Sequence, residues 1–83
     1  MDGSALVKRL AARRLALESL PSPAERRNIR RAAGVSQDDL AGVLGCHPNT
    51  VRSLERGRTK PRGDLLARYV GALDFLRQMA DWR

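Results

Sequence analysis

Residues 36–57 read SQDDLAGVLGCHPNTVRSLERG and contain two short helical patterns separated by a glycine turn. Ser36, with Asp39 three residues later, is a capping signal for the first helix, and Gly45 is a natural stop after it. Pro48 suits the first position of the second helix. The apolar residues at helical spacing are Leu40, Val43, Leu44, Val51 and Leu54. Helices this short need tertiary packing, so we expect both to bury this face against the rest of the chain.

The segments on either side of this pair also have helical patterns. Ser4–Leu20 is rich in Ala, Leu and Arg, which are good helix formers. The next helix begins after the capping residue Ser22 and ends at Gly34. Asp64–Trp82 carries apolar residues at helical spacing and forms one helix, or two that are broken near Asp74. No segment is a strand candidate, so the sequence predicts an all-α compact bundle of five or six helices.

The turn and the residues that follow it indicate an interaction with nucleic acid. Two short helices joined by a tight turn that contains glycine have the geometry of a helix-turn-helix. Between Arg52 and Arg62 there are five basic residues and one acidic residue, Glu55. The whole chain of 83 residues has a formal net charge of +7. A charge this far from neutral favours a polyanionic partner, either nucleic acid or an anionic membrane, and the clustering is typical of phosphate contacts.

An ordered set of residues resembles the phage repressor and Cro family, also called the xenobiotic-response-element type. The set comprises Gly34, Ser36-Gln37, Leu40-Ala41, Gly45, Glu55 and Gly57. The resemblance runs from about Glu25 to Leu73. It implies a lambda-repressor-like fold with a helix-turn-helix, and the chain is similar in size to small Cro proteins and to the controller proteins of restriction-modification systems.

The resemblance also implies roles for individual residues. The residues expected to contact bases are Pro48, Asn49, Arg52 and Ser53. Asn can pair with adenine and Arg with guanine, whereas Pro offers only apolar contact. The residues expected to contact the DNA backbone are Gln37, Arg56, Arg58, Lys60 and Arg62. Arg30 and Glu55 match positions that often form a buried ion pair in this family, and we expect that pair here.

The chain is expected to have three parts. Residues 1–21 form an N-terminal helical extension, residues 22–73 the helix-turn-helix domain, and residues 74–83 a C-terminal helical extension. The first part has an apolar stripe of Leu6, Leu10, Leu17 and Leu20, interrupted by Arg13. The last part adds the apolar residues Phe75, Leu76, Met79 and Trp82. Such residues beyond a small core often form an interface, so they predict a homodimer; the alternative is that they only cover the core.

Several other classes of function have no support in the residues. We find no nucleophile–base pair, no paired carboxylates and no glycine-rich phosphate loop, so an enzyme with catalytic residues is not expected. One Cys and one His give no metal site and no internal disulfide, and no cofactor is implied. No apolar run approaches the roughly 20 residues that span a membrane, and we see no signal peptide. These features and the resemblance predict a cytoplasmic, nucleoid-associated protein of a bacterium, phage or other mobile element.

Together these observations predict a transcriptional regulator. It would bind double-stranded DNA sequence-specifically, as a dimer on a pseudo-palindromic operator. It could repress by blocking RNA polymerase or activate by contacting it. The alternative is a helix-turn-helix antitoxin or antiactivator whose main partner is another protein, and the N-terminal helix is the feature that supports this alternative.

Overall fold

The computed structural model describes residues 3–18 and 20–81, and this part of the chain contains five α-helices and no strand. The helices are α1 (Ser4–Glu18), α2 (Pro23–Ala32), α3 (Gln37–Leu44), α4 (Pro48–Glu55) and α5 (Gly63–Asp81). The predicted all-α fold is therefore confirmed. Because α5 runs without a break through Asp74, the expected boundary between residues 73 and 74 falls inside one helix.

Capping residues set the bounds of the short helices. The Ser22 hydroxyl accepts a hydrogen bond from the Glu25 backbone N–H at the start of α2. Ser36 and Asp39 form a reciprocal capping box before α3, and Gly45 ends that helix in the left-handed region at φ 70°. The serine hydroxyls at the starts of α2 and α3, and the left-handed glycine at the end of α3, satisfy backbone groups that would otherwise lack partners.

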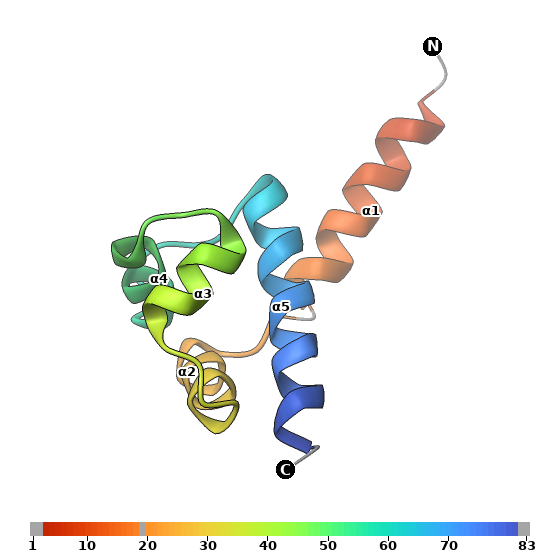
Figure 1. Cartoon of the computed structure of the whole chain (residues 1–83). Coiled ribbons are helices and arrows are strands. Elements are labelled where there is room, and N and C mark those ends of the chain that lie inside the picture. The colour runs from red at the N-terminus through yellow and green to blue at the C-terminus, as the bar shows by residue number, and fades with distance from the viewer. Residues whose placement is uncertain (1–2, 19, 82–83) are drawn as a thin grey trace.

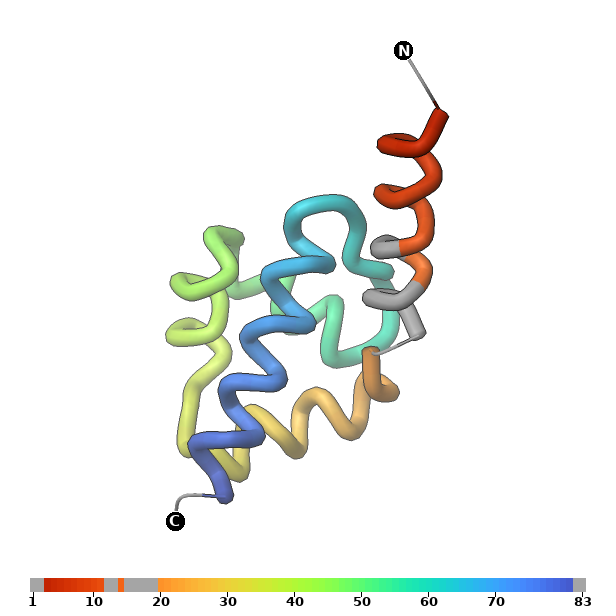
Figure 2. Tube along the Cα trace, turned by 90° about the vertical axis from the view of Figure 1, so that its right-hand side faces the viewer, coloured from red at the N-terminus to blue at the C-terminus, as the bar shows by residue number. Residues whose placement is uncertain are grey.

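Four helices form the body of the molecule, and α1 projects from it (Figure 1). α5 packs against α2 and α3, α4 packs against α2 and α3, and α1 contacts α5. Figure 2 shows α1 standing apart from the body formed by α2–α5. This projection contributes to the long dimension of the molecule, 46 Å against 28 and 20 Å in the other directions.

The apolar stripe expected on α1 is not a buried face. Leu6 and Leu10 are 60% and 55% exposed, and Val7 beside them is 63% exposed. The reason is that this half of α1 extends past the body, where none of the other described helices covers it (Figure 1). The side chains of Arg13 and Leu17 lie outside the described part of the structure.

The core lies between α5 and the α2–α4 layer. Its largest fully buried side chains are Leu40, Leu44, Val51, Leu54, Leu66, Tyr69 and Leu73. Val43, which was expected on the inner face of α3, is 69% exposed. The buried side of α3 is instead made by Leu40, Ala41 and Leu44, and the helix periodicity turns Val43 away from that side.

The residues expected at a dimer interface divide into different environments. Leu76 is only 5% exposed and belongs to the core cluster, so the structure corrects its assignment to a surface between subunits. Met79 is half-buried and packs against the core, whereas Phe75 is 60% exposed. Trp82 lies outside the described residues. Leu76 is buried because it continues the inner stripe of Leu66, Tyr69 and Leu73 along the unbroken α5.

The left-handed backbone of Gly57 provides a test of the tight turn that follows α4. Its φ is +71°, and a Cβ at this position would lie 3.2 Å from Cγ of Pro23. We expect Gly57→Ala to lower the free energy of unfolding by about 1–2 kcal/mol, because a left-handed conformation is unfavourable for a residue with a side chain. Urea denaturation measures this change.

Gly42→Ala is the matched control. Gly42 lies inside α3, and a Cβ there would meet no atom within 4 Å. Alanine is the better helix former, so this variant should be up to about 1 kcal/mol more stable than the original chain. Similar losses in both variants would contradict the strain assigned to Gly57.

Candidate nucleic-acid interface

α3 and α4 pack against each other and are joined by the turn at residues 45–47. α4 begins where the Nδ1 atom of His47 accepts a hydrogen bond from the Asn49 backbone N–H at 3.0 Å, followed by Pro48 at the first helical position. A histidine thus takes the place of the usual Ser or Thr cap by offering a ring nitrogen as the acceptor. α4 buries Val51 and Leu54, which leaves its opposite side facing outward.

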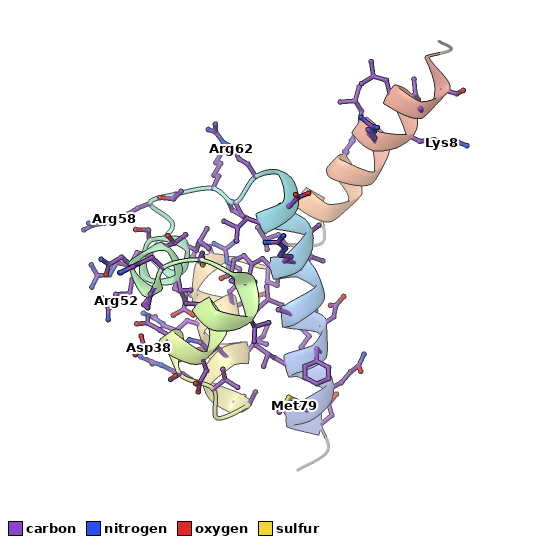
Figure 3. All side chains as sticks on the ribbon, turned by 45° about the horizontal axis from the view of Figure 1, so that its top comes forward. Lys8, Asp38, Arg52, Arg58, Arg62 and Met79 are labelled. Atoms are coloured by element: carbon purple, nitrogen blue, oxygen red, sulfur yellow. The ribbon has the colours of Figure 1, made fainter. Side chains whose placement is uncertain are left out.

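The side chains expected to contact bases lie on or near this outward side. Asn49 and Arg52 are exposed, and Pro48 and Ser53 are half-buried. Figure 3 shows Arg52 and Arg58 pointing to the same side of the molecule, and Lys8 on α1 lying far from both. The four basic residues expected to contact the DNA backbone, Arg56, Arg58, Lys60 and Arg62, are all exposed. The structure therefore brings these residues onto α4 and the loop that follows it.

A buried ion pair anchors α4 to α2. Arg30 Nε donates to Glu55 Oε2 at 2.6 Å, and Arg30 Nη2 donates to Glu55 Oε1 at 3.0 Å. The third nitrogen, Nη1, donates to the Val35 carbonyl oxygen at 2.9 Å. The two charged side chains are 8% and 2% exposed. The planar guanidinium thus satisfies a carboxylate on one edge and a loop carbonyl beside it, which is the geometry that makes a buried charge tolerable.

The ion pair keeps Glu55 ionised. Burial acts to raise the pKa of this carboxyl, but hydrogen bonds from Arg30 and Gln37 and the charges of Arg30 and Arg27 outweigh it. The pKa therefore lies below the usual value of 4.5. A carboxylate with a lowered pKa stabilises the fold above its ordinary pKa, and this contribution is lost as the pH falls through the lowered value.

Hydrogen bonds continue from the ion pair to the surface. Gln37 Nε2 donates to Glu55 Oε1 at 3.1 Å, and Arg52 Nε donates to Gln37 Oε1 at 3.3 Å. Arg52 Nη1 then donates to Asn49 Oδ1 at 2.6 Å. The charges on both sides fix the orientation of the Gln37 amide, because a carboxylate only accepts and a guanidinium only donates. We call the set Glu55, Gln37, Arg52 and Asn49 the relay.

Gln37 has a place that the sequence did not predict. It was expected at the DNA backbone, and in the structure its half-buried side chain also bridges a buried acid and an exposed arginine. Its position at the start of α3, which packs beside α4, makes this bridge possible. Nη2 of Arg52 takes part in neither of the bonds to Gln37 and Asn49.

Two further arginines bind the C-terminal ends of the two short helices. Arg26 Nη2 donates to the Leu54 carbonyl at 2.8 Å, and Arg68 Nη1 donates to the Leu44 carbonyl at 3.4 Å. Both carbonyls belong to the last turn of their helix, where acceptors lack partners within the helix and the helix dipole favours a cation. The C-terminal end of α4 is thus held by a side chain of α2, and the C-terminal end of α3 by a side chain of α5.

Arg26 is a residue whose role sequence reasoning missed, since the sequence analysis assigns it no function. It is 5% exposed and lies over the Tyr69 ring, 5.3 Å from the ring centroid. Burial raises the pKa of Tyr69 to about 12, so the ring beneath the cation is a neutral phenol. The available signal was spacing: Arg26 and Arg30 are four residues apart and share one face of α2.

A family model described as a helix-turn-helix domain matches residues 25–82, from α2 to the end of α5. The chain belongs to the helix-turn-helix domain family. No curated protein and no solved structure gave a significant match.

Membership of the helix-turn-helix domain family indicates a DNA-binding regulator, a class that is typically not enzymatic. In this helix-turn-helix domain α3 and α4 are the two helices of the motif, and α4 is the second one. Among the described residues no group of three or more His, Cys, Asp or Glu side chains could hold a metal ion. None of the described helices has the length and hydropathy needed to cross a membrane.

The ion pair gives a test of how α2 holds α4. Arg30→Ala leaves Glu55 buried without its counter-ion, so we expect the free energy of unfolding to fall by about 3–5 kcal/mol. Thermal and urea denaturation followed by circular dichroism measure the loss. Arg31→Ala is the matched control, since Arg31 is exposed on the same helix and should cost less than about 1 kcal/mol. An Arg30→Ala variant with an unchanged melting temperature would exclude a structural role for the pair.

Proposed function

We propose that the chain is a sequence-specific transcriptional regulator of the repressor and Cro type, acting as a dimer on a pseudo-palindromic DNA operator. The observation that carries the proposal is the relay. It connects a buried carboxylate to Asn49 and Arg52, the two exposed side chains of α4 best suited to base recognition. A side chain that only covers a solvated surface needs no such support, whereas base recognition depends on donors and acceptors held in place.

Base recognition in this proposal is assigned to the N-terminal part of α4. This part of the second helix enters the major groove in helix-turn-helix proteins. Arg52 would donate to a guanine and Asn49 would pair with an adenine, while Pro48 and Ser53 would make apolar and single hydrogen-bond contacts. Gln37 is assigned to positioning Arg52, in addition to any contact with a phosphate.

Phosphate contacts are assigned to the exposed basic residues after α4, which are Arg56, Arg58, Lys60 and Arg62. Their charges would set the register of the protein on the duplex without reading its sequence. The formal net charge of +7 supports this assignment, because attraction to the phosphates supplies most of the nonspecific affinity.

The dimer is proposed to use the outer side of α5. Phe75 is the large apolar residue exposed there, and Met79 and Trp82 follow it in the sequence. A twofold dimer would place its half-sites about one turn of DNA apart, roughly 34 Å. Bound at a promoter, such a dimer would repress by excluding RNA polymerase or activate by contacting it.

A second candidate function has one observation in its favour. The projecting half of α1 exposes Leu6, Val7 and Leu10, which is unusual for a helix with no partner. An antitoxin or antiactivator would use such a surface to bind another protein. Purification of a stoichiometric partner with the chain, together with a lack of sequence preference in DNA, would favour this candidate.

Selection of bound sequences from a random DNA pool tests the main proposal. The selection should be done at about 150 mM salt, where nonspecific binding is weakened. We expect an enriched pseudo-palindrome with half-sites about one turn apart. Binding that depends on salt but enriches no sequence would refute the assignment of base recognition to α4.

Variants then separate base recognition from phosphate contact. On the selected site Arg52→Ala should weaken binding by about 1–3 kcal/mol and relax the preference at one base pair. Arg58→Ala should weaken binding to all sequences alike and reduce the salt dependence of the affinity by about one unit of slope. Fluorescence anisotropy across a salt series, with matched and mismatched duplexes, measures both effects. A uniform loss from Arg52→Ala would remove it from the base-reading set.

A further inference from the structure

We propose that a hollow between the start of α2 and the loop at residues 56–62 binds a small organic acid. The carboxylate of the acid would lie on Arg26 and Lys60, and its apolar body would lie against the rest of the wall. We call these two features of the chain the Arg26 hollow and the basic loop. The site follows from the free chain, and only its effect on DNA binding rests on the proposed function.

The buried charges do not balance within the described part of the chain. Arg26, Arg30 and Glu55 are the charged side chains buried there. Both carboxylate oxygens of Glu55 accept from Arg30, so these two charges neutralise each other. Arg26 remains as a buried cation without a carboxylate partner among the described residues. Because a buried charge is costly unless it is paired, an anion bound beside Arg26 would stabilise this arrangement.

The guanidinium of Arg26 also has donors to spare. Only Nη2 donates to a described residue, through the 2.8 Å bond to the Leu54 carbonyl. Nε is buried without a hydrogen-bond partner, and so is the hydroxyl of Tyr69, over whose ring the guanidinium lies. The bond to Leu54 and the contact with the ring hold the guanidinium in place. Its remaining donors are therefore positioned before a ligand binds.

Arg26 forms part of the wall of the Arg26 hollow, which has a volume of about 280 Å³. Leu20, Pro23 and Pro61 give the wall an apolar side. Lys60 of the basic loop adds a second cation, which is exposed. Pro23 is the first residue of α2, so the positive end of this helix dipole lies at the same wall. No acidic side chain is among the described residues that line the hollow.

The wall indicates which chemical class of ligand fits. A carboxylate suits a guanidinium and an ammonium, because hydrogen bonds between charged groups are stronger than those between neutral ones. An apolar body suits the side made by leucine and proline, since contact there removes apolar surface from water. A small organic acid with one carboxylate and one apolar part has both groups.

The other hollows of the described chain lack this combination. A hollow of about 360 Å³ between α2 and α5 is lined by both Arg77 and Asp81, which are exposed charges of opposite sign. An open hollow along the basic loop has Arg58, Lys60 and Arg62 as its charged residues, and all three are exposed cations. A buried cation with unused donors is found only at the Arg26 hollow among these three sites.

Lys60 connects the Arg26 hollow to the proposed function. It lines the hollow and belongs to the residues assigned to phosphate contacts. A carboxylate bound to Lys60 would neutralise a charge that attracts the DNA backbone, so the acid would weaken DNA binding. DNA would weaken binding of the acid by the same factor, because such coupling is reciprocal. The acid would thus act as an inducer.

Benzoate is the probe for the binding site. Two-dimensional amide NMR of the full chain, without DNA, follows the signals of Arg26, Thr59 and Lys60 as benzoate is added. We expect saturable changes with a dissociation constant in the millimolar range. Benzamide has the same shape without the charge, and acetate has the charge without the ring. Both should bind at least about tenfold more weakly, with the ionic strength held constant by sodium chloride.

Two pairs of variants locate the site. Lys60→Gln should weaken binding of benzoate by at least about threefold. Arg58→Gln removes the same charge from the same loop, but Arg58 points away from the body and is not part of the wall (Figure 3). This control should change the affinity by less than about twofold. Arg26→Gln should abolish binding, whereas Arg27→Gln, at the exposed next position, should not. Circular dichroism shows whether each chain folds, and the comparison of Lys60→Gln with Arg58→Gln is decisive if Arg26→Gln does not.

Several outcomes would overturn the site. The absence of a saturable change with benzoate would exclude it. Equal binding of benzoate and benzamide would show an apolar hollow that does not recognise an anion. Equal losses from Lys60→Gln and Arg58→Gln would indicate attraction to the whole basic loop. Tighter binding of inorganic phosphate than of benzoate would assign the hollow to a phosphate of the DNA backbone.

The effect on DNA is measured separately by fluorescence anisotropy on the selected duplex. Saturating benzoate should lower the affinity by at least about threefold relative to benzamide at the same ionic strength. An unchanged affinity would overturn the role of the acid as an inducer. If the proposed function is wrong, no sequence is selected, yet benzoate still binds the free chain. If the site is wrong, a sequence is selected and benzoate does not bind, so the two failures are distinguishable.

Discussion

The bidentate contact between Arg30 and Glu55 is the interaction on which the rest of the molecule depends. It joins α2 to the end of α4, and its third donor holds the loop before α3 through the Val35 carbonyl. Both charged side chains are almost fully buried, so water cannot replace either partner if the other is lost. The same carboxylate oxygen that binds Arg30 also accepts from Gln37. The buried Glu55 and its partner Arg30 therefore fix how α2, the loop before α3, and α4 meet. Through Gln37, Glu55 also supports the exposed side chain of Arg52.

Arginine has several distinct roles in this small chain. Arg30 balances a buried acid, Arg26 and Arg68 bind helix ends, and Arg52 and Arg58 face outward. The flat guanidinium suits each role, because it can bind a carboxylate, a carbonyl or an aromatic face without losing its charge. The number of basic residues alone therefore overstates the basic surface that the protein offers to DNA, because the side chains of Arg26 and Arg30 are buried inside the fold.

The order and bounds of the helices could be predicted because they are local. Ser22, Ser36 and Gly45 act on backbone groups within a few residues, so the sequence contains the whole interaction. The exposure of Val43, the burial of Leu76 and the projection of α1 depend on which neighbour covers a face, and that neighbour is distant in the sequence. The placement of Asn49 and Arg52 on the exposed side of α4 could be predicted from the sequence, whereas the bridge through Gln37 depends on the relative placement of α3 and α4.

Under the proposed function, the bond from Arg52 to Asn49 has a consequence for how an operator can change. The two side chains share one hydrogen bond at 2.6 Å, so a change in either one alters the position of the other. Preferences for neighbouring base pairs would then be non-additive, and a table of independent preferences at each position would describe them poorly. A regulator and its operator with this arrangement would diverge by paired steps, in which two bases and two side chains change together.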